Sequence, residues 1–273
     1  QVTIGKANIC ESEVLGRDPV LVSDAMKRAA AHGVPEDFLK ATEGYTGAVA
    51  RFDTGKPGPT TAFRSDIDCV LVRETDNPEH LPNKLGFASE RPGFMHACGH
   101  DGHTAVGLAV AHWLVMNKDR LCGRFILIFQ PAEEGVRAMA ASGLVDHVDY
   151  FLGGHVGGDA KLGEIAVMDG GFLASTKFDV SIEGTPAHAG NSPELGHSAL
   201  MAACAASLMI QGIPRNSHGE TRVSVGKLEA GEGRNVIPAH AKLQMEVRGE
   251  TMAVNQFMAD YVYDIFAGVD KAY

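Results

Sequence analysis

The sequence has few basic residues relative to its acidic ones, and it lacks any long apolar segment. It holds 24 Lys and Arg against 34 Asp and Glu, which gives a formal net charge of −10. Binding to nucleic acid or to an anionic membrane relies on clustered Lys and Arg, so this acidic chain favours neither partner. No apolar run reaches the roughly 18 residues of a transmembrane helix. Residues 1–14 contain no basic or apolar segment typical of a signal peptide, and we expect none.

The sequence also lacks the paired spacing of cysteines that marks a disulfide framework or a zinc ribbon. The five cysteines are odd in number and widely spaced, with no CxxC, at Cys10, Cys69, Cys98, Cys122 and Cys204. This usage predicts reduced thiols in a cytoplasmic compartment. Three of them, at 69, 122 and 204, have apolar neighbours and are expected to be small core residues. Cys98 instead lies between histidines.

The first half of the sequence contains alternating segments with the patterns of strands and helices. With 273 residues and 45% hydrophobic content, the chain is long enough for one large domain or two modest ones. Residues 1–45 look helical. Beyond them, a strand leading into a loop, a buried helix and two further apolar strands are predicted, at 61–72, 105–117, 124–135 and 148–156. Such an order favours an α/β domain with a mostly parallel sheet.

The pattern changes near Gly171. Three segments then alternate between apolar and polar residues, as half-exposed antiparallel strands do, at 176–184, 222–228 and 242–249. A helix is predicted between the first two, over residues 196–212. We therefore expect a small α+β domain over 172–260, and no internal repeats or low-complexity tracts interrupt the chain.

Side chains able to bind a metal ion recur where the predicted strands of the first domain end. The stretch "MHACGHDGHT" (95–104) places Cys98 and His100 on either side of a glycine, just before a helix. Glu133 and Glu134 follow one strand, and His155 follows the next. In a parallel sheet these ends share one edge, where sites form. A thiolate, imidazoles and a carboxylate suit zinc, manganese or cobalt better than calcium.

Two other interpretations of these residues remain open. Each histidine alone could be an ordinary polar loop residue, and a Glu–Glu pair is often a solvated loop. Cys98 could also be a nucleophile paired with a histidine, although that chemistry gives Glu133 and Glu134 no role. In the metal interpretation, one glutamate binds the metal while its neighbour acts as a general base on water.

Five motifs in this order resemble the dinuclear metallo-amidohydrolases, a family that includes aminoacylase, carboxypeptidase G, hippurate hydrolase and the auxin-conjugate hydrolases. The similarity runs from about residue 45 to 260. It rests on "MHACGHDGHTA", "FQPAEEG", "GGHV", "GTPAHAGNSPELGHSAL" and "GEGRNVIPAHAKLQMEVRG". Within the family, "EGYTGAVARFDTGKPGP" and "VDYFLGGHVG" are most similar to members that act on p-aminobenzoyl-glutamate.

The resemblance implies a zinc-peptidase-like catalytic domain with an inserted lid and dimerisation domain that carries a four-stranded antiparallel sheet. It implies two divalent ions, manganese or zinc, or else cobalt, in a homodimeric enzyme that hydrolyses p-aminobenzoyl-glutamate to p-aminobenzoate and glutamate. A second hydrolase subunit is a further expected partner. The ligands it implies are Cys98, His100, Glu134 and His155, with Glu133 as the catalytic base and later acid.

The resemblance also assigns roles outside the ligand set. His188 of the lid would reach the active site of the other subunit, where it would stabilise the oxyanion, and Asn235 and Arg248 would hold the substrate carboxylate. Asp101, His103 and His96 would support the ligands without binding metal. Asp66 and Asp68 fit either such a role or that of loop and cap residues. Without the resemblance, we would predict that His188 is a loop histidine and that Arg248 is a charged surface residue.

The sequence departs from the family at its ends. Members carry a further ligand histidine after the lid and a longer N-terminal helix, so we expect an incomplete chain. The expected domains are 1–171, catalytic with its C-terminal part absent, 172–262, the lid, and 263–273, a return toward the catalytic domain. Two alternatives stay open: a broader N-acyl-amino-acid hydrolase or dipeptidase, and a non-catalytic metal-binding or partner subunit.

Overall fold

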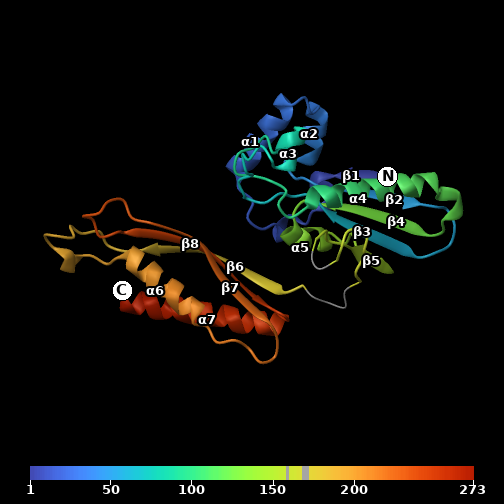
Figure 1. The fold of residues 1–273 in the computed structure, drawn as a ribbon. Helices are drawn as coiled ribbons and strands as arrows, with labels where there is room; N and C mark the ends of the chain where they lie inside the picture. Colours follow the sequence, from blue (N-terminus) through green and yellow to red (C-terminus); the bar gives the residue numbers. More distant parts are fainter. Residues whose placement is uncertain (158–159, 168–171) are drawn as a thin grey trace. The chain divides into compact units, whose positions relative to one another are not determined.

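A computed structural model describes residues 1–157, 160–167 and 172–273 (Figure 1). The chain forms two compact units, Gln1–Glu164 and Ile165–Tyr273, and each is described by itself. The boundary predicted near Gly171 lies outside the described residues. Among the residues described, no helix is long and apolar enough to cross a membrane.

The first unit is an α/β structure. Its strands are β1 (Val2–Ile4), β2 (Ala48–Asp53), β3 (Thr60–Asp66), β4 (Arg124–Gln130) and β5 (Tyr150–Gly153). Its helices are α1 (Pro19–Ala31), α2 (Glu36–Thr42), α3 (Leu81–Leu85), α4 (His100–Met116) and α5 (Val136–Ala140). The strand, helix, strand order expected between residues 61 and 156 is confirmed.

The five strands form one sheet in the order β1-β2-β4-β3-β5. β3 runs parallel to both β4 and β5, whereas β2 is antiparallel to β4, so the sheet is mixed and the predicted parallel part is its β4-β3-β5 half. The register pairs Asp66 with Gln130 and Arg64 with Gly153. The three parallel strands therefore end at one edge, and the segments that follow them start there.

Helix α4 packs closely on this sheet. A Cβ at Gly107 would lie 2.7 Å from Ser65 Oγ and 2.8 Å from the ring of Phe129, so only glycine lets the helix approach β3 and β4 this closely. The helix begins at His100, five residues before the predicted start, and includes His103. Buried apolar side chains beneath the sheet complete the core, from Val49, Ala62, Ile128, Met139 and Leu144.

Two expectations for this unit were wrong in part. Residues 1–45 are not wholly helical, because β1 pairs with β2 at the sheet edge before α1 and α2 form. Cys69 and Cys122 are exposed rather than buried, since each lies in a loop next to a strand instead of within it. All five cysteines, each in the described part of the chain, are free thiols.

The second unit is an α+β structure, as expected. It comprises β6 (Ala174–Glu183), α6 (Ala199–Gln211), β7 (Thr221–Ala230), β8 (His240–Gly249) and α7 (Met252–Ala272). The sheet is antiparallel in the order β6-β8-β7, and the expected fourth strand is not found among the described residues. Ser198 and Thr251 begin the two helices by accepting hydrogen bonds from their first turns.

Both helices cover one face of this sheet. Ile210 of α6, Leu243 of β8 and Met258 and Val262 of α7 are almost wholly buried. Residues 263–273, expected to lead back toward the first unit, form the last turns of α7, where Ile265 and Val269 join the core of the second unit. The apolar alternation along β6 and β8 explains this packing, because alternate residues face one side of a strand.

Candidate metal centre

The candidate site lies where β3, β4 and β5 end and α4 begins. Gly99 occupies the N-cap of α4 in a left-handed conformation (φ +84°), which glycine adopts without steric cost. A Cβ there would lie 2.3 Å from Val156 Cγ2, so any other residue would collide with the loop after β5. Gly99 thus lets the cysteine and histidine that flank it approach the third strand end.

The structure brings four of the predicted site residues together. One ligand atom each from Cys98, His100, Glu133 and His155 lie within 4.8 Å of one another. Cys98 Sγ is 3.3 Å from His155 Nε2, and His100 Nε2 is 3.6 Å from Glu133 Oε2. These residues come from three separate loops, so the cluster arises from the sheet topology and not from local sequence. The side chain of Glu134, the predicted ligand, lies outside the described parts.

His100 is oriented by Asp68. Its Nδ1 lies 2.9 Å from Asp68 Oδ1 and 3.0 Å from the Asp68 carbonyl oxygen, both of which only accept, so Nδ1 carries the proton. The other nitrogen, Nε2, therefore carries an unprotonated lone pair. It is buried and has no hydrogen-bond partner among the described residues. Asp68 Oδ1 also accepts the backbone N–H of Glu133 at 3.2 Å. One carboxylate thus positions both a candidate ligand and the candidate base.

His155 is held through its neighbour Val156. His155 Nδ1 donates to the Val156 carbonyl oxygen at 2.8 Å, which leaves its Nε2 to face Cys98. The Val156 N–H in turn donates to His103 Nε2 at 2.9 Å. That bond occupies Nε2 of His103 and, in the neutral ring, places the proton on Nδ1. His103 therefore supports the His155 loop in this arrangement.

A second group of side chains that could hold a metal ion shares His100 with the first. Asp66, His100 and His103 are all buried, and within the described parts of the chain the Asp66 carboxylate and His103 Nδ1 lack hydrogen-bond partners. Asp66 still has a charged neighbour, because Arg64 Nη2 lies 2.5 Å from its Oδ1 without hydrogen-bond alignment. Burial raises the pKa of the Asp66 carboxyl, against the opposing effect of Arg64. Burial likewise lowers the pKa of His103 and so favours the neutral ring that accepts from Val156.

The charge around Cys98 is negative. Burial raises the pKa of its thiol, and the carboxylates of Glu133, Asp68 and Asp66 add to the shift. A bound cation is the natural counter-charge for such a group, because a metal ligand must be a thiolate. The orphaned Nε2 of His100, the nearby thiol and the imidazole of His155 make a donor set that fits a zinc-like divalent ion.

Sequence reasoning undervalued two residues here. It did not decide whether Asp68 supports a ligand or is a loop or cap residue, because its spacing from His100 gives no signal of contact. It did not consider Gln130, whose buried side chain donates to the carbonyl oxygens of Ala132 at 2.6 Å and Glu133 at 3.0 Å. A buried amide at the end of an apolar strand is the signal that could have identified it.

Other predicted residues lie outside the cluster. Asp101 is exposed in the first turn of α4, and His96 is exposed in the loop before it. In the second unit, His188 and Asn235 lie on adjacent loops: Ala189 N–H donates to the Asn235 carbonyl oxygen at 3.0 Å, and His188 bridges to Val236.

Arg248 lies on β8, where its guanidinium contacts both carboxylate oxygens of Glu246 at 2.9 and 3.1 Å. This pairing orients the guanidinium along the strand, next to the opposing residue Arg222 of β7.

With this geometry established, comparisons with known proteins identify the family. The model of peptidase family M20/M25/M40 matches residues 62–258. The chain belongs to this family, which confirms the fold class expected from the sequence.

Three curated relatives match the whole chain. A homolog of a p-aminobenzoyl-glutamate hydrolase subunit, from Haemophilus influenzae, is 49% identical, and the corresponding p-aminobenzoyl-glutamate hydrolase subunit of Escherichia coli is 44% identical. An indole-3-acetyl-aspartic acid hydrolase of Enterobacter agglomerans is 45% identical. The chain spans 64–65% of the length of these relatives.

Solved structures agree with this assignment. An aminobenzoyl-glutamate utilization protein of Klebsiella pneumoniae superposes with a TM-score of 0.76 at 41% identity, over 100% of this chain and 64% of that one. A dinuclear metal binding peptidase of the M20 family from Bacillus subtilis superposes with a TM-score of 0.57 at 28% identity, over 95% of this chain and 66% of that one.

Proposed function

We propose that this chain provides the catalytic centre of a metal-dependent amidohydrolase that cleaves the amide bond of an N-acyl amino acid. The observation that carries the proposal is the group formed by Cys98, His100, Glu133 and His155, in which the buried His100 Nε2 has no hydrogen-bond partner among the described residues. A buried lone pair without a partner costs free energy, and a bound cation removes that cost.

The proposed substrate is p-aminobenzoyl-glutamate, cleaved to p-aminobenzoate and glutamate. Its support is the set of relatives similar over the full chain, whose names specify p-aminobenzoyl-glutamate and indole-3-acetyl-aspartic acid. Both compounds join an aromatic acyl group to an acidic amino acid through an amide. A broader N-acyl-amino-acid hydrolase is the alternative, and product analysis over a panel of acyl-amino acids separates the two.

In this proposal Cys98, His100, Glu134 and His155 hold two divalent ions, manganese, zinc or cobalt. Such ions polarise an amide carbonyl and lower the pKa of water toward about 7. The Glu133 carboxylate accepts the proton of the attacking water and later protonates the leaving amine. Its position is suited to this work, because Asp68 holds its backbone N–H beside His100.

Residues of the second unit complete the proposal. His188 of a second copy stabilises the negative charge that develops on the carbonyl oxygen, and Asn235 and Arg248 hold the substrate carboxylate. This requires a homodimer, and a second hydrolase subunit remains a further proposed partner. The free thiols fit the cytoplasmic compartment expected from the sequence.

A cysteine nucleophile is the second candidate, because Cys98 Sγ lies 3.3 Å from His155 Nε2. Its electrostatics argue against it. A nucleophilic cysteine needs a lowered pKa, whereas burial and three carboxylates raise the pKa of Cys98. Removal of metal with a chelator and restoration by Mn²⁺ or Zn²⁺ supports the metal centre. Full activity in the chelated protein would support the nucleophile.

The central test is Glu133→Gln, measured with p-aminobenzoyl-glutamate and by elemental analysis of bound metal. Loss of the base should lower kcat by about 10²–10⁴-fold, with metal content unchanged. Glu36→Gln, at an exposed position of α2, is the matched control and should keep full activity. A Glu133→Gln protein that retains most of its kcat would contradict the assigned role. Absence of metal from the unmodified protein would favour a non-catalytic subunit.

A further inference from the structure

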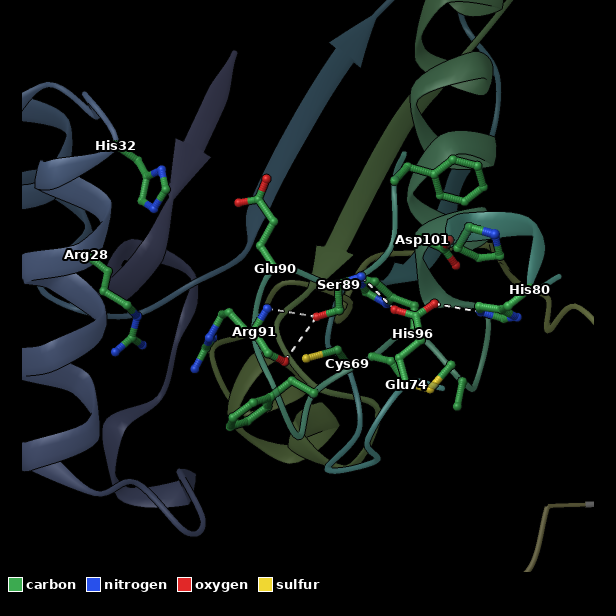
Figure 2. Close-up of a pocket in the computed structure, with 15 residues that line it drawn as sticks. Arg28, His32, Cys69, Glu74, His80, Ser89, Glu90, Arg91, His96 and Asp101 are labelled. Carbon is green, nitrogen blue, oxygen red and sulfur yellow. Dashed lines mark hydrogen bonds and ion pairs between the residues drawn. The ribbon is translucent and has the colours of Figure 1, made fainter. Parts of the chain in front are cut away.

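A hollow in the first unit is lined by residues that stand next in the chain to the candidate metal centre. Its volume is about 860 Å³, and it lies between the C-terminal part of α1, the segment 69–97 and the first turn of α4 (Figure 2). His96 and Ala97 line it and directly precede Cys98 in the chain. The roles proposed above for the metal ligands and the catalytic base do not involve this hollow.

Two arginines lie on this hollow from opposite walls. Arg28 lies on α1 and His32 is the C-cap residue of that helix, whereas Arg91 comes from the facing loop. Figure 2 shows Arg28 and Arg91 directed toward the space between α1 and this loop. Within the described residues, neither guanidinium has a carboxylate within ion-pair distance. By contrast, Arg64 and Arg124 each pair with an aspartate.

Arg91 is held in place by contacts that leave its charge available. Ser89 Oγ accepts the Arg91 N–H and donates to the Arg91 carbonyl oxygen, both at 3.2 Å. Glu74 fixes Ser89 by accepting its N–H at 2.6 Å, and it contacts His80 at 2.8 Å. The guanidinium stacks 4.3 Å above the Phe94 ring. These contacts fix the loop, while the Arg91 guanidinium donates no hydrogen bond to any residue that the structure describes.

Acidic side chains also line the hollow, but they lie elsewhere along it. Asp101 belongs to the first turn of α4, and Figure 2 shows it on the side away from α1. Glu90 follows Ser89, and in the same view its carboxylate points away from Arg28 and Arg91. The α1 side of the hollow is thus cationic, and the ligand chemistry that complements it is an anionic group.

We propose that Arg28 and Arg91 bind the side-chain carboxylate of an acidic amino acid in the substrate, which makes this hollow the subsite that selects glutamate or aspartate. This rests on the proposed amidohydrolase function. Two guanidinium groups are suited to a carboxylate, because each offers a planar pair of donors. The names of the relatives agree, since their amino acids are glutamate and aspartate and their acyl groups differ.

The test measures kcat/KM for p-aminobenzoyl-glutamate and for p-aminobenzoyl-glutamine, which has the same shape without the side-chain charge. The measurements use the metal-loaded protein with Arg28→Gln, Arg91→Gln or both. Each lost charged hydrogen bond should reduce the preference for glutamate about tenfold or more. Arg91→Lys should retain part of it. Arg120→Gln, at an exposed arginine just past the far end of α4, is the matched control and should leave the preference unchanged. Thermal melting checks that each variant is folded.

The outcomes separate the two proposals. A reduced glutamate preference in Arg28→Gln and Arg91→Gln, with the control unchanged, supports the subsite. A preference unchanged in the active double variant overturns the subsite and leaves the amidohydrolase function standing. If the unmodified, metal-loaded protein hydrolyses neither compound, the proposed function fails and the subsite fails with it.

Discussion

The surroundings of Cys98 in the first unit differ sharply from those of His188 in the second. His100 is almost wholly buried and is held by Asp68, while His155 is fixed through a neighbouring peptide that His103 also holds. His188 is exposed in its loop, and its ring accepts the N–H of Gly190, two residues away, at 3.2 Å. The first region is preorganised by contacts across the sheet, whereas the second is organised by contacts between short loops.

The difference indicates what each region requires. A metal centre needs ligands fixed in advance by contacts between elements, because their mutual geometry sets affinity. A residue that stabilises charge on the substrate needs only a stable loop that presents it to a facing surface. The adjacent loops of His188 and Asn235 fit this second requirement, and our predictions test the contrast from the largest expected effect to the smallest.

After Glu133→Gln, the largest effect is expected from His188→Ala. If its imidazole stabilises the developing oxyanion, kcat should fall about 10²–10³-fold, and metal content should stay the same. His218→Ala, another loop histidine of the second unit, serves as the control. Mixing His188→Ala protein with Glu133→Gln protein then tests whether His188 of one subunit acts in the active site of the other. Mixed dimers with one intact site should recover activity, and mixed dimers without recovery would contradict action between subunits.

An intermediate effect is expected from Asp68→Asn. The substitution keeps the shape of the side chain but weakens its hold on the His100 Nδ1–H, so metal affinity should fall about 10–100-fold. Competition with a chelator measures this affinity. Asp37→Asn, on the exposed face of α2, should bind metal as the unmodified protein does. If both variants bind equally well, Asp68 has no part in orienting the ligand.

The smallest effect concerns pH. Because the pKa of Cys98 is raised, its thiol is protonated near neutral pH, and binding of a metal must release that proton. Metal affinity should therefore increase with pH, by about tenfold per unit for one proton, until pH reaches the thiol pKa. Titration by calorimetry at several pH values measures the slope. Cys98→Ser should flatten it, whereas Cys122→Ser should not; equal slopes in both variants would exclude the thiol as the source.

Much of the first unit could be predicted because its signals are local. The apolar runs before Glu133 and His155 indicated strands, and parallel strands bring their carboxyl ends to one edge. That reasoning predicted that Cys98, His100, Glu133, Glu134 and His155 would lie at one edge. One ligand atom each from Cys98, His100, Glu133 and His155 lie within 4.8 Å of one another, whereas the side chain of Glu134 lies outside the described residues. The first 45 residues were harder, because β1 has only three residues and exists through its pairing with β2.

The supporting contacts could not be predicted for a different reason. Asp68 and His100 are 32 residues apart, and His103 and Val156 are 53 apart, so no periodic pattern links them. In the second contact the donor is a backbone amide, which every residue except proline possesses. The lining of the Arg28–Arg91 hollow is equally non-local, since it joins α1 to a loop some sixty residues further along.

The sequence by itself determined the α/β and α+β character of the two units and the residue types at the candidate metal centre. Hydrophobic periodicity and the ends of strands can be recognised within short segments of the chain. Only the tertiary structure decided how those residues are oriented: which nitrogen of His100 is free, that His103 supports a loop, and that Arg28 and Arg91 share one hollow. Orientation depends on distant partners, which only the folded chain brings within hydrogen-bond distance.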